Sequence, residues 1–261
     1  MKALIIDSHI HLDIIFTDHP DQISWLKANR IFPVSWAFSN HIESLNDLRN
    51  YLKQQASIIQ KLNATTLPCR FLAGIHPRNI PSDLAAKDVG ELLIPFLKDP
   101  LCLGMGEIGL ESGNEKEVEI MTAQLALADT IKSMNKKIGI HTPRKNKTAI
   151  TIKLLELLQD FSGIEPFTVI DHCSPETISG VLDRGYQAGV TLSPEKTSVE
   201  ELKHMIQTFP ANLDRIMCNT DSCMTFSKDL HRFFTDHSVA DEIRNALCFK
   251  NASGFFNLIR C

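Results

Sequence analysis

The feature that most constrains the fold is an alternation of short apolar runs with longer stretches of helical spacing. Eight runs have strand character: Ala3–Asp7, Pro33–Phe38, Arg70–His76, Leu101–Gly106, Lys137–His141, Phe167–Asp171, Gln187–Leu192 and Arg215–Asn219. Helices are predicted at Pro20–Asn29, Ile42–Leu62, Ser82–Leu97, Glu115–Asn135, Asn146–Asp160, Pro175–Arg184, Ser198–Phe209 and Val239–Leu258. This alternation predicts parallel strands joined by crossover helices.

Chain length decides between the two folds that fit this pattern. Over 261 residues, a closed (β/α)8 TIM barrel is more economical than an open doubly wound sheet, which remains the alternative. Strands buried on both faces should be continuously apolar, as the run Phe167–Ile170 is. No repeat or Gly/Ser/Pro-rich linker divides the chain, so we expect residues 1–261 to form a single domain.

Charge and cysteine content exclude several classes of protein. The 27 basic and 31 acidic residues give a net charge of −4, which supplies no overall field for holding duplex DNA. The seven cysteines lack any paired CxxC spacing, so we expect a reducing, cytoplasmic setting. The N-terminal apolar run is too short for a signal peptide, and no stretch has the length of a membrane span. We therefore expect no membrane attachment; the pattern specifies no oligomeric state.

Polar side chains of metal-binding type follow one predicted strand after another. They are His9 and His11 after the first strand, His76 after the third, Glu107 after the fourth, His141 after the fifth, His172 after the sixth and Asp221 after the eighth. The carboxyl ends of barrel strands share one rim, so these residues should converge. Each alone has an ordinary explanation as a core histidine or a turn residue. Together they predict a metal site.

Local spacing refines these candidates. His9 and His11 lie two residues apart in an extended segment, so both can face one metal. Glu107 lies between glycines, and its two oxygens can bridge two metals. Glu111 is a weaker candidate because it lies further from its strand. Asp171 receives little weight for orienting a metal-bound ring, because neighbours on a strand face opposite ways. The remaining histidines are expected at the surface: His19, His41, His204, His231 and His237.

One basic cluster lies near the predicted rim. Arg144, Lys145 and Lys147 follow His141 directly and could hold a phosphate group. The alternative, of equal weight, is the solvated first turn of a helix.

Six segments resemble the TatD-like metal-dependent hydrolases in identity and order: Asp7–Asp13, Gly74–Pro77, Gly106–Leu110, His141–Arg144, Asp171–Cys173 and Thr220–Ser222. The resemblance extends to the closing segment Asn251–Phe256. It implies that His9, His11 and Asp221 hold one metal, that His141 and His172 hold another, and that Glu107 bridges them.

Two departures from the family pattern concern the eighth strand. Asn219 stands where the family usually has glutamate, and Cys223-Met224 replaces the Pro-Tyr or similar pair expected after Ser222. The strings at 74–81, 141–147 and 191–196 look more like the branch of TatD-related predicted hydrolases.

This resemblance implies hydrolysis with one or two divalent metals, namely Zn, Mn or Mg, that activate water. Asp221 is the expected base and Glu107 the second catalytic residue, while His76, Arg144 and Lys145 are the expected substrate-binding residues. The expected substrate is a small phosphodiester or a nucleic-acid end, which makes a deoxyribonuclease the leading hypothesis. The alternatives are an amidohydrolase or lactonase acting on a small molecule, and a metal-binding barrel without turnover.

Overall fold

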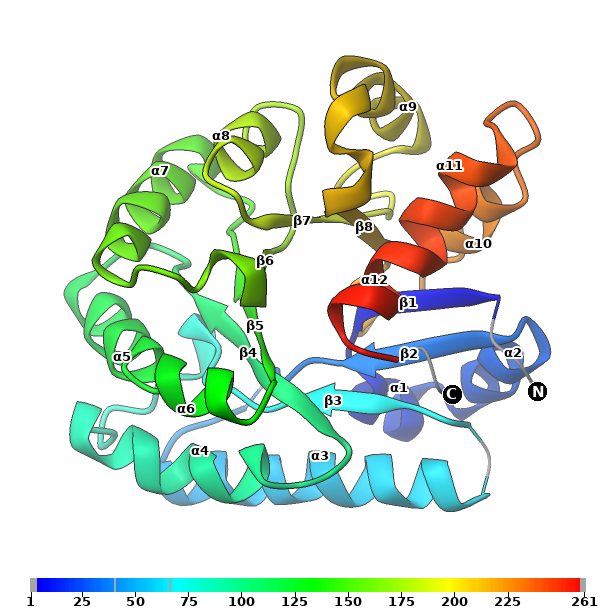
Figure 1. Cartoon of the computed structure of the whole chain (residues 1–261). Helices are drawn as coiled ribbons and strands as arrows, with labels where there is room; N and C mark the ends of the chain where they lie inside the picture. Colours follow the sequence, from blue (N-terminus) through cyan, green and yellow to red (C-terminus); the bar gives the residue numbers. More distant parts are fainter. Residues whose placement is uncertain (1–3, 40, 66, 259–261) are drawn as a thin grey trace.

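The computed structural model describes residues 4–39, 41–65 and 67–258. Eight parallel strands form a nearly closed barrel in sequential order, with the helices outside it (Figure 1). The strands are β1 Ile5–Ile10, β2 Ile31–Ser35, β3 Arg70–Leu72, β4 Cys102–Gly109, β5 Lys137–His141, β6 Thr168–Ile170, β7 Gln187–Thr191 and β8 Ile216–Asn219. The predicted (β/α)8 barrel is confirmed, and the doubly wound sheet is excluded.

The helices are α1 Leu12–Asp18, α2 Pro20–Ala28, α3 Leu45–Thr65, α4 Val89–Leu97, α5 Glu115–Leu125, α6 Ala128–Ser133, α7 Lys147–Leu157, α8 Ile178–Asp183, α9 Val199–Thr208, α10 Asp229–Phe234, α11 Asp241–Asn245 and α12 Asn251–Phe255. A π-helical turn, η6 Ala246–Lys250, joins the last two. The short helices α1 and α10 were not predicted from the sequence. Ala3, the first residue of the first predicted strand, lies outside the described residues.

The predicted helix Glu115–Asn135 was wrong in one respect, because the chain turns between α5 and α6. No glycine or proline marks this break in the sequence. The Gln124 side chain, near the end of α5, both donates to and accepts from the backbone of Ile75, at 3.2 and 2.8 Å. This contact across the barrel wall ties the end of α5 in place, and periodicity along the chain does not reveal it.

The barrel closes between its first and last strands through the segment that follows β8. The Asp221 amide donates to the His9 carbonyl, and the His11 amide donates to the Ser222 carbonyl, both at 2.9 Å. The pairing register shifts between Asp7 and Ile10 in β1 and between Met105 and Ile108 in β4. Such irregularities re-aim side chains. His9 and Glu107 lie within these two shifted segments, inside their strands and not after them as predicted.

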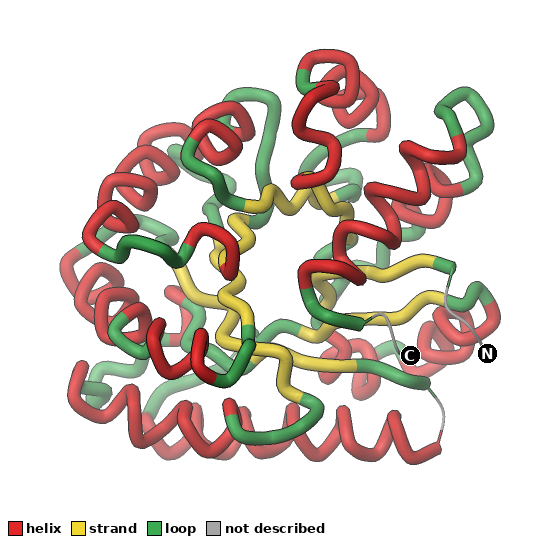
Figure 2. Tube along the Cα trace, in the orientation of Figure 1, coloured by secondary structure: helices red, strands yellow, loops and turns green. Residues whose placement is uncertain are grey.

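Two apolar clusters hold the fold together. The larger one packs helices on the outside of the barrel. The other fills the barrel interior and includes Ile6, Phe32, Val34, Trp36, Leu72, Val169, Met217, Ala252, Phe255, Phe256 and Leu258. Its last four members come from α12 and the residues after it. The Phe255 ring lies 5.0 Å from the ammonium of Lys137, the first residue of β5, which places α12 at the amino end of the barrel (Figure 2).

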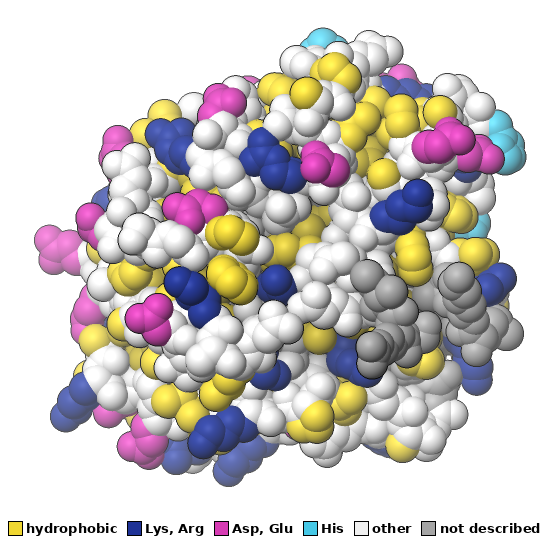
Figure 3. Space-filling model, in the orientation of Figure 1, with side chains coloured by type: hydrophobic (Ala, Val, Ile, Leu, Met, Phe, Trp, Pro, Cys, Tyr) yellow, Lys and Arg dark blue, Asp and Glu magenta, His cyan; other side chains and the backbone are white. Residues whose placement is uncertain are grey.

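The surface charge is mixed. On the face seen in Figure 3, basic and acidic side chains are interspersed, in keeping with the net charge of −4. Within the described residues, no helix combines the length and hydropathy needed to cross a bilayer.

Candidate metal centre

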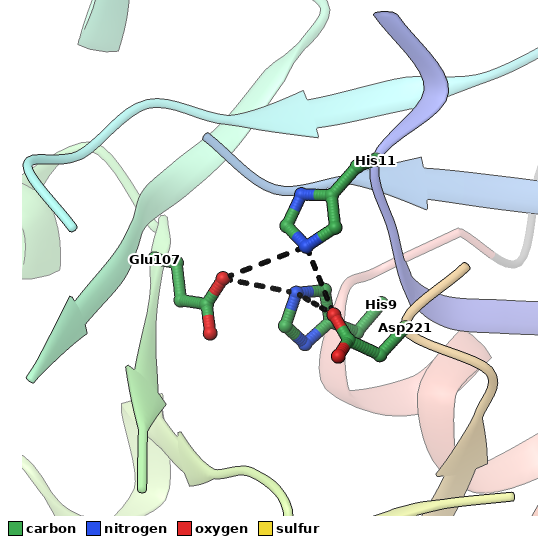
Figure 4. Close-up of side chains that lie close together, drawn as sticks. All are labelled: His9, His11, Glu107 and Asp221. Carbon is green, nitrogen blue, oxygen red and sulfur yellow. Dashed lines mark hydrogen bonds and ion pairs between the residues drawn. The ribbon is translucent and has the colours of Figure 1, made fainter. Parts of the chain in front are cut away.

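Four predicted side chains meet at the carboxyl end of the barrel (Figure 4). They are His9 in β1, His11 directly after β1, Glu107 in β4 and Asp221 after β8. One ligand-type atom from each lies within 4.8 Å of the others. The histidines and Glu107 are buried, and the Asp221 side chain is 19% exposed. The rim therefore brings together two imidazoles and two carboxylates that are up to 212 positions apart in the chain.

Glu107 divides this centre into two halves. Its Oε2 lies 3.3 Å from His9 Nε2 and 3.7 Å from His11 Nε2. Its Oε1 lies 2.7 Å from His141 Nδ1 and 3.2 Å from His172 Nε2. Burial raises the pKa of Glu107, but the histidines around it outweigh burial and hold the pKa well below its usual range. The carboxylate is therefore ionised and faces two separate pairs of histidines.

Hydrogen bonds orient the first pair of rings. His11 Nδ1 donates to the Trp36 carbonyl at 3.0 Å, and its Nε2 lies 2.9 Å from Asp221 Oδ1. His9 Nδ1 forms a short hydrogen bond with Asp171 Oδ2, and the Trp36 ring stacks on the His9 ring at 4.0 Å. The Nε2 atoms of both rings are thereby turned toward the centre.

The position of Asp171 contradicts our expectation that this residue has little role in orienting a histidine ring. It orients the ring of His9, which lies across the barrel, and it also lies 3.5 Å from Nδ1 of the adjacent His172. The strand rule does not apply here because β6 ends at Ile170 and His172 has a left-handed backbone, with φ of 59°. Both side chains consequently face the site.

The second half contains one more carboxylate than predicted. His141 Nε2 lies 2.8 Å from Glu111 Oε2, so this ring is held between Glu111 and Glu107. The hydrogen bond from His141 outweighs burial and lowers the pKa of Glu111 to about 2. Burial lowers the pKa of His141, but the two carboxylates raise it overall. The centre thus includes Glu111, which was the weaker candidate in the sequence because it lies further from its strand; the loop after β4 folds back and brings it to His141.

Lys196 is the residue that sequence reasoning missed. Its ammonium contacts the Asp221 carboxylate and lies 3.0 Å from His172 Nδ1. Burial raises the pKa of Asp221, but Lys196, His172 and nearby groups hold it well below its usual range. Lys196 comes from the loop after β7, and the string Thr191–Lys196 noted in the sequence was the one available signal.

His76 is buried beside the centre, where its Nε2 lies 3.6 Å from Glu107 Oε1. Its Nδ1 accepts a hydrogen bond from the Arg78 amide at 3.0 Å. Burial lowers the pKa of His76 to about 4, so the ring is neutral and its proton resides on Nε2. This ring therefore presents an N–H donor to the centre and no free lone pair for a metal.

The residues present fit a divalent metal. His9 Nε2 is buried and has no hydrogen-bond partner, although it faces Glu107 and Asp221 at 3.3 and 3.4 Å. Burial lowers the pKa of His9, but Glu107, Asp171 and Asp221 raise it to about 10. The negative charge of the carboxylates holds a proton on His9, and the same charge can hold a metal cation in place of that proton. Imidazole and carboxylate donors suit Zn²⁺ and Mn²⁺ better than Mg²⁺.

A cavity of about 330 Å³ opens onto this centre. Its basic lining residues are Arg78, Arg144 and Lys196. Arg144 forms an ion pair with Glu195 at 2.5 Å. A neighbouring cavity of about 600 Å³ shares Arg144, His172, Glu195 and Lys196 with the first.

The predicted basic cluster is thus brought to the site only in part. Lys145 is exposed and lines neither cavity, and the Lys147 ammonium donates to the His172 carbonyl at 2.7 Å. The histidines assigned to the surface, namely His19, His41, His204, His231 and His237, are exposed or half-buried.

Comparisons with known proteins agree with this geometry. A family sequence profile described as TatD related DNase matches residues 6–232. A protein from Methanocaldococcus jannaschii, described as an uncharacterized metal-dependent hydrolase, is 25% identical over 97% of this chain and all of its own length. The crystal structure of a TatD-like protein from Archaeoglobus fulgidus is 25% identical, with a TM-score of 0.74 over 97% of this chain and 99% of its own. A TatD homolog from Escherichia coli is 19% identical and shares the fold, with a TM-score of 0.69 over 98% of this chain and 99% of its own. The chain therefore belongs to the TatD-like metal-dependent hydrolase family.

Proposed function

We propose that this protein hydrolyses phosphodiester bonds and that its substrate is a small phosphodiester or the end of a nucleic acid. The observation that carries the proposal is the position of the Glu107 carboxylate, whose two oxygens face separate pairs of histidines. Two cations about a bridging carboxylate are a recurring arrangement for in-line displacement at phosphorus. The family profile, which is described as that of a DNase, supports the same reaction class.

We assign one ion to His9, His11 and Asp221 and a second to His141 and His172, with Glu107 between them. Zn²⁺, Mn²⁺ and Mg²⁺ are the candidates, and the imidazole donors favour the first two. When bound, a divalent ion lowers the pKa of water toward neutrality and polarises a phosphoryl oxygen.

The protein's own groups supply the remaining steps. The ionised Asp221 carboxylate accepts the proton of the attacking water. Arg78, Arg144 and Lys196 line the cavity and balance the phosphate charge, whereas the buried His76 lies outside the cavity lining and points its Nε2–H at Glu107. A cavity of about 330 Å³ is at the small end of ligand sites, so a strand end enters more readily than a duplex.

The test uses chelator-treated protein reconstituted with Zn²⁺, Mn²⁺ or Mg²⁺. We expect metal-dependent cleavage of a chromogenic phosphodiester and of a linear single-stranded oligonucleotide, with a circular single strand of the same sequence resistant. A preference for a lactone or an amide would favour the amidohydrolase or lactonase alternative. Metal binding without turnover on any of these substrates would favour the non-catalytic barrel.

A further inference from the structure

Asn219 lies beneath the candidate metal centre and touches none of the family's expected ligands. It is the last residue of β8, it pairs with Thr191 at the end of β7, and its side chain is fully buried. Asn219 Nδ2 donates to Asp171 Oδ1 at 2.7 Å, and Thr191 Oγ1 donates to Asn219 Oδ1 at 2.9 Å. Its amide therefore joins two neighbours that each contact a histidine.

The two neighbours extend this connection to both halves of the centre. Asp171 Oδ2 forms the short hydrogen bond with His9 Nδ1. Thr191 Oγ1 lies 2.7 Å from His172 Nδ1. A continuous buried chain thus runs from His9 through Asp171, Asn219 and Thr191 to His172. Gly189 makes room for it, because a Cβ there would lie 2.0 Å from Asp171 Oδ1.

Donor and acceptor chemistry sets the direction of the bond between Asn219 and Asp171. An ionised carboxylate only accepts, so the side of the amide that faces Asp171 is the NH2 group and Oδ1 faces Thr191. Oδ1 is buried and needs a donor, and among the described residues the Thr191 hydroxyl supplies it. With its own proton given to Asn219, the Thr191 oxygen is free to accept from His172 Nδ1–H, 2.7 Å away, and this bond would leave the Nε2 lone pair of His172 for the centre. On the other side, Asp171 accepts a hydrogen bond from His9 Nδ1–H, which turns His9 Nε2 toward Glu107 and Asp221.

We infer that Asn219 is a positioning residue that fixes the ring orientations of His9 and His172, one in each half of the centre, and the tautomer of His172. The inference rests on the proposed metal assignment of these two histidines. An ionised glutamate, the residue that the family resemblance places here, could not donate to Asp171. Asn219 supplies that donor and acts by holding two rings, not by contacting substrate.

One competing arrangement defines the test. His172 Nε2 lies 3.2 Å from Glu107 Oε1, and Lys196 Nζ lies 3.0 Å from His172 Nδ1. If these contacts governed the ring, His172 would carry its proton on Nε2 and Asn219 Oδ1 would lose its donor. The two arrangements place the His172 proton on different ring nitrogens, so the spectrum of metal-free protein distinguishes them.

The experiment tests separately the link from Asn219 through Thr191 to His172 and the link through Asp171 to His9. Thr191→Val removes the hydroxyl link to His172, whereas Asn219→Asp keeps an acceptor for Thr191 but removes the donor to Asp171. Thr168→Val is the matched control, because Thr168 is equally buried on β6 and its hydroxyl donates to the Ile164 carbonyl at 2.8 Å, away from the centre. Thr191→Ser restores the hydroxyl. The readouts are histidine side-chain ¹⁵N spectra of metal-free protein and calorimetric titration with Zn²⁺ alone.

We expect the His172 proton on Nδ1 in the wild type, in Thr191→Ser and in Thr168→Val, and on Nε2 in Thr191→Val. Zn²⁺ affinity should fall about 10- to 100-fold in Thr191→Val and Asn219→Asp and stay unchanged in the control. An Nε2 proton on His172 in the wild type, or wild-type Zn²⁺ affinity in both variants, would overturn the inference. If Asn219→Asp does not fold, the Thr191 variants still decide. Neither readout depends on catalysis, so failure of the proposed phosphodiesterase activity would be recognised separately.

Discussion

The two ends of the barrel bury very different side chains within one continuous set of strands. At the amino end, Phe255, Phe256 and Leu258 pack into an apolar interior with Ile6 and Met217. At the carboxyl end, five histidines are buried around Glu107: His9, His11, His76, His141 and His172. Trp36 separates the two regions, since it belongs to the apolar cluster and stacks on His9.

This difference teaches that burial serves opposite purposes at the two ends. Apolar burial at the amino end stabilises the fold in proportion to the area removed from water. Burial of charged groups at the carboxyl end costs free energy unless partners compensate it. That cost is tolerated where the groups act on a ligand. Changes at the amino end should therefore alter stability, and changes at the carboxyl end should alter activity.

The largest effect on activity is expected from Asp221→Asn. Asparagine keeps the size of Asp221 and tolerates its left-handed backbone, with φ of 49°, but cannot take a proton. We expect kcat on the phosphodiester to fall about 10²- to 10⁴-fold at saturating Mn²⁺ or Zn²⁺, with little change in Tm. Near-wild-type turnover under those conditions would remove Asp221 from the mechanism.

The largest effect on stability is expected from Phe256→Ala at the amino end. Phe256 is 3% exposed in the apolar interior, so its truncation should lower the free energy of unfolding by about 3–5 kcal/mol. Denaturant unfolding measures this loss, and activity per folded molecule should be retained. Ile152→Ala, at a side chain that is 50% exposed, is the control with little effect. A large loss of kcat in folded Phe256→Ala protein would break the separation of the two ends.

A smaller effect should distinguish the basic residues at the rim. Arg144 lines the cavity but is exposed and paired with Glu195, so Arg144→Ala should raise KM for a phosphodiester only about three- to tenfold. KM for a neutral ester should not change. Lys145→Ala is the matched control because Lys145 lines neither cavity. Equal losses on the charged and neutral substrates would argue against phosphate binding by Arg144.

The smallest effect concerns the charge of Lys137, which lies against the apolar end. The Lys137 ammonium lies 5.0 Å from both the Phe167 and Phe255 rings, and burial lowers its pKa. The folded state then binds fewer protons than the unfolded state between that lowered pKa and 10.5, so stability rises with pH in this window. Lys137→Met should flatten the rise and change stability by less than about 1 kcal/mol. Unfolding measured between pH 7 and 10.5 checks this, and an undiminished slope would contradict it.

The sequence by itself determined the barrel and most of its rim. Strand runs such as Lys137–His141 alternate with amphipathic stretches, and this local pattern is enough to predict parallel strands whose carboxyl ends converge. Residue type and position at a strand end can be recognised without knowing the neighbours in space. The sequence therefore also predicted the four side chains of the centre, His9, His11, Glu107 and Asp221.

Only the tertiary structure decided which groups act on those ligands. Asp171 meets His9 although 162 positions separate them, and Lys196 reaches Asp221 from another loop. Left-handed backbone at His172 and the shifted register of β1 redirect side chains against the simple rule of strand alternation. Hydrogen-bond direction, ring tautomer and ion pairing depend on distances of a few ångströms between remote segments, and those distances exist only once the barrel has closed.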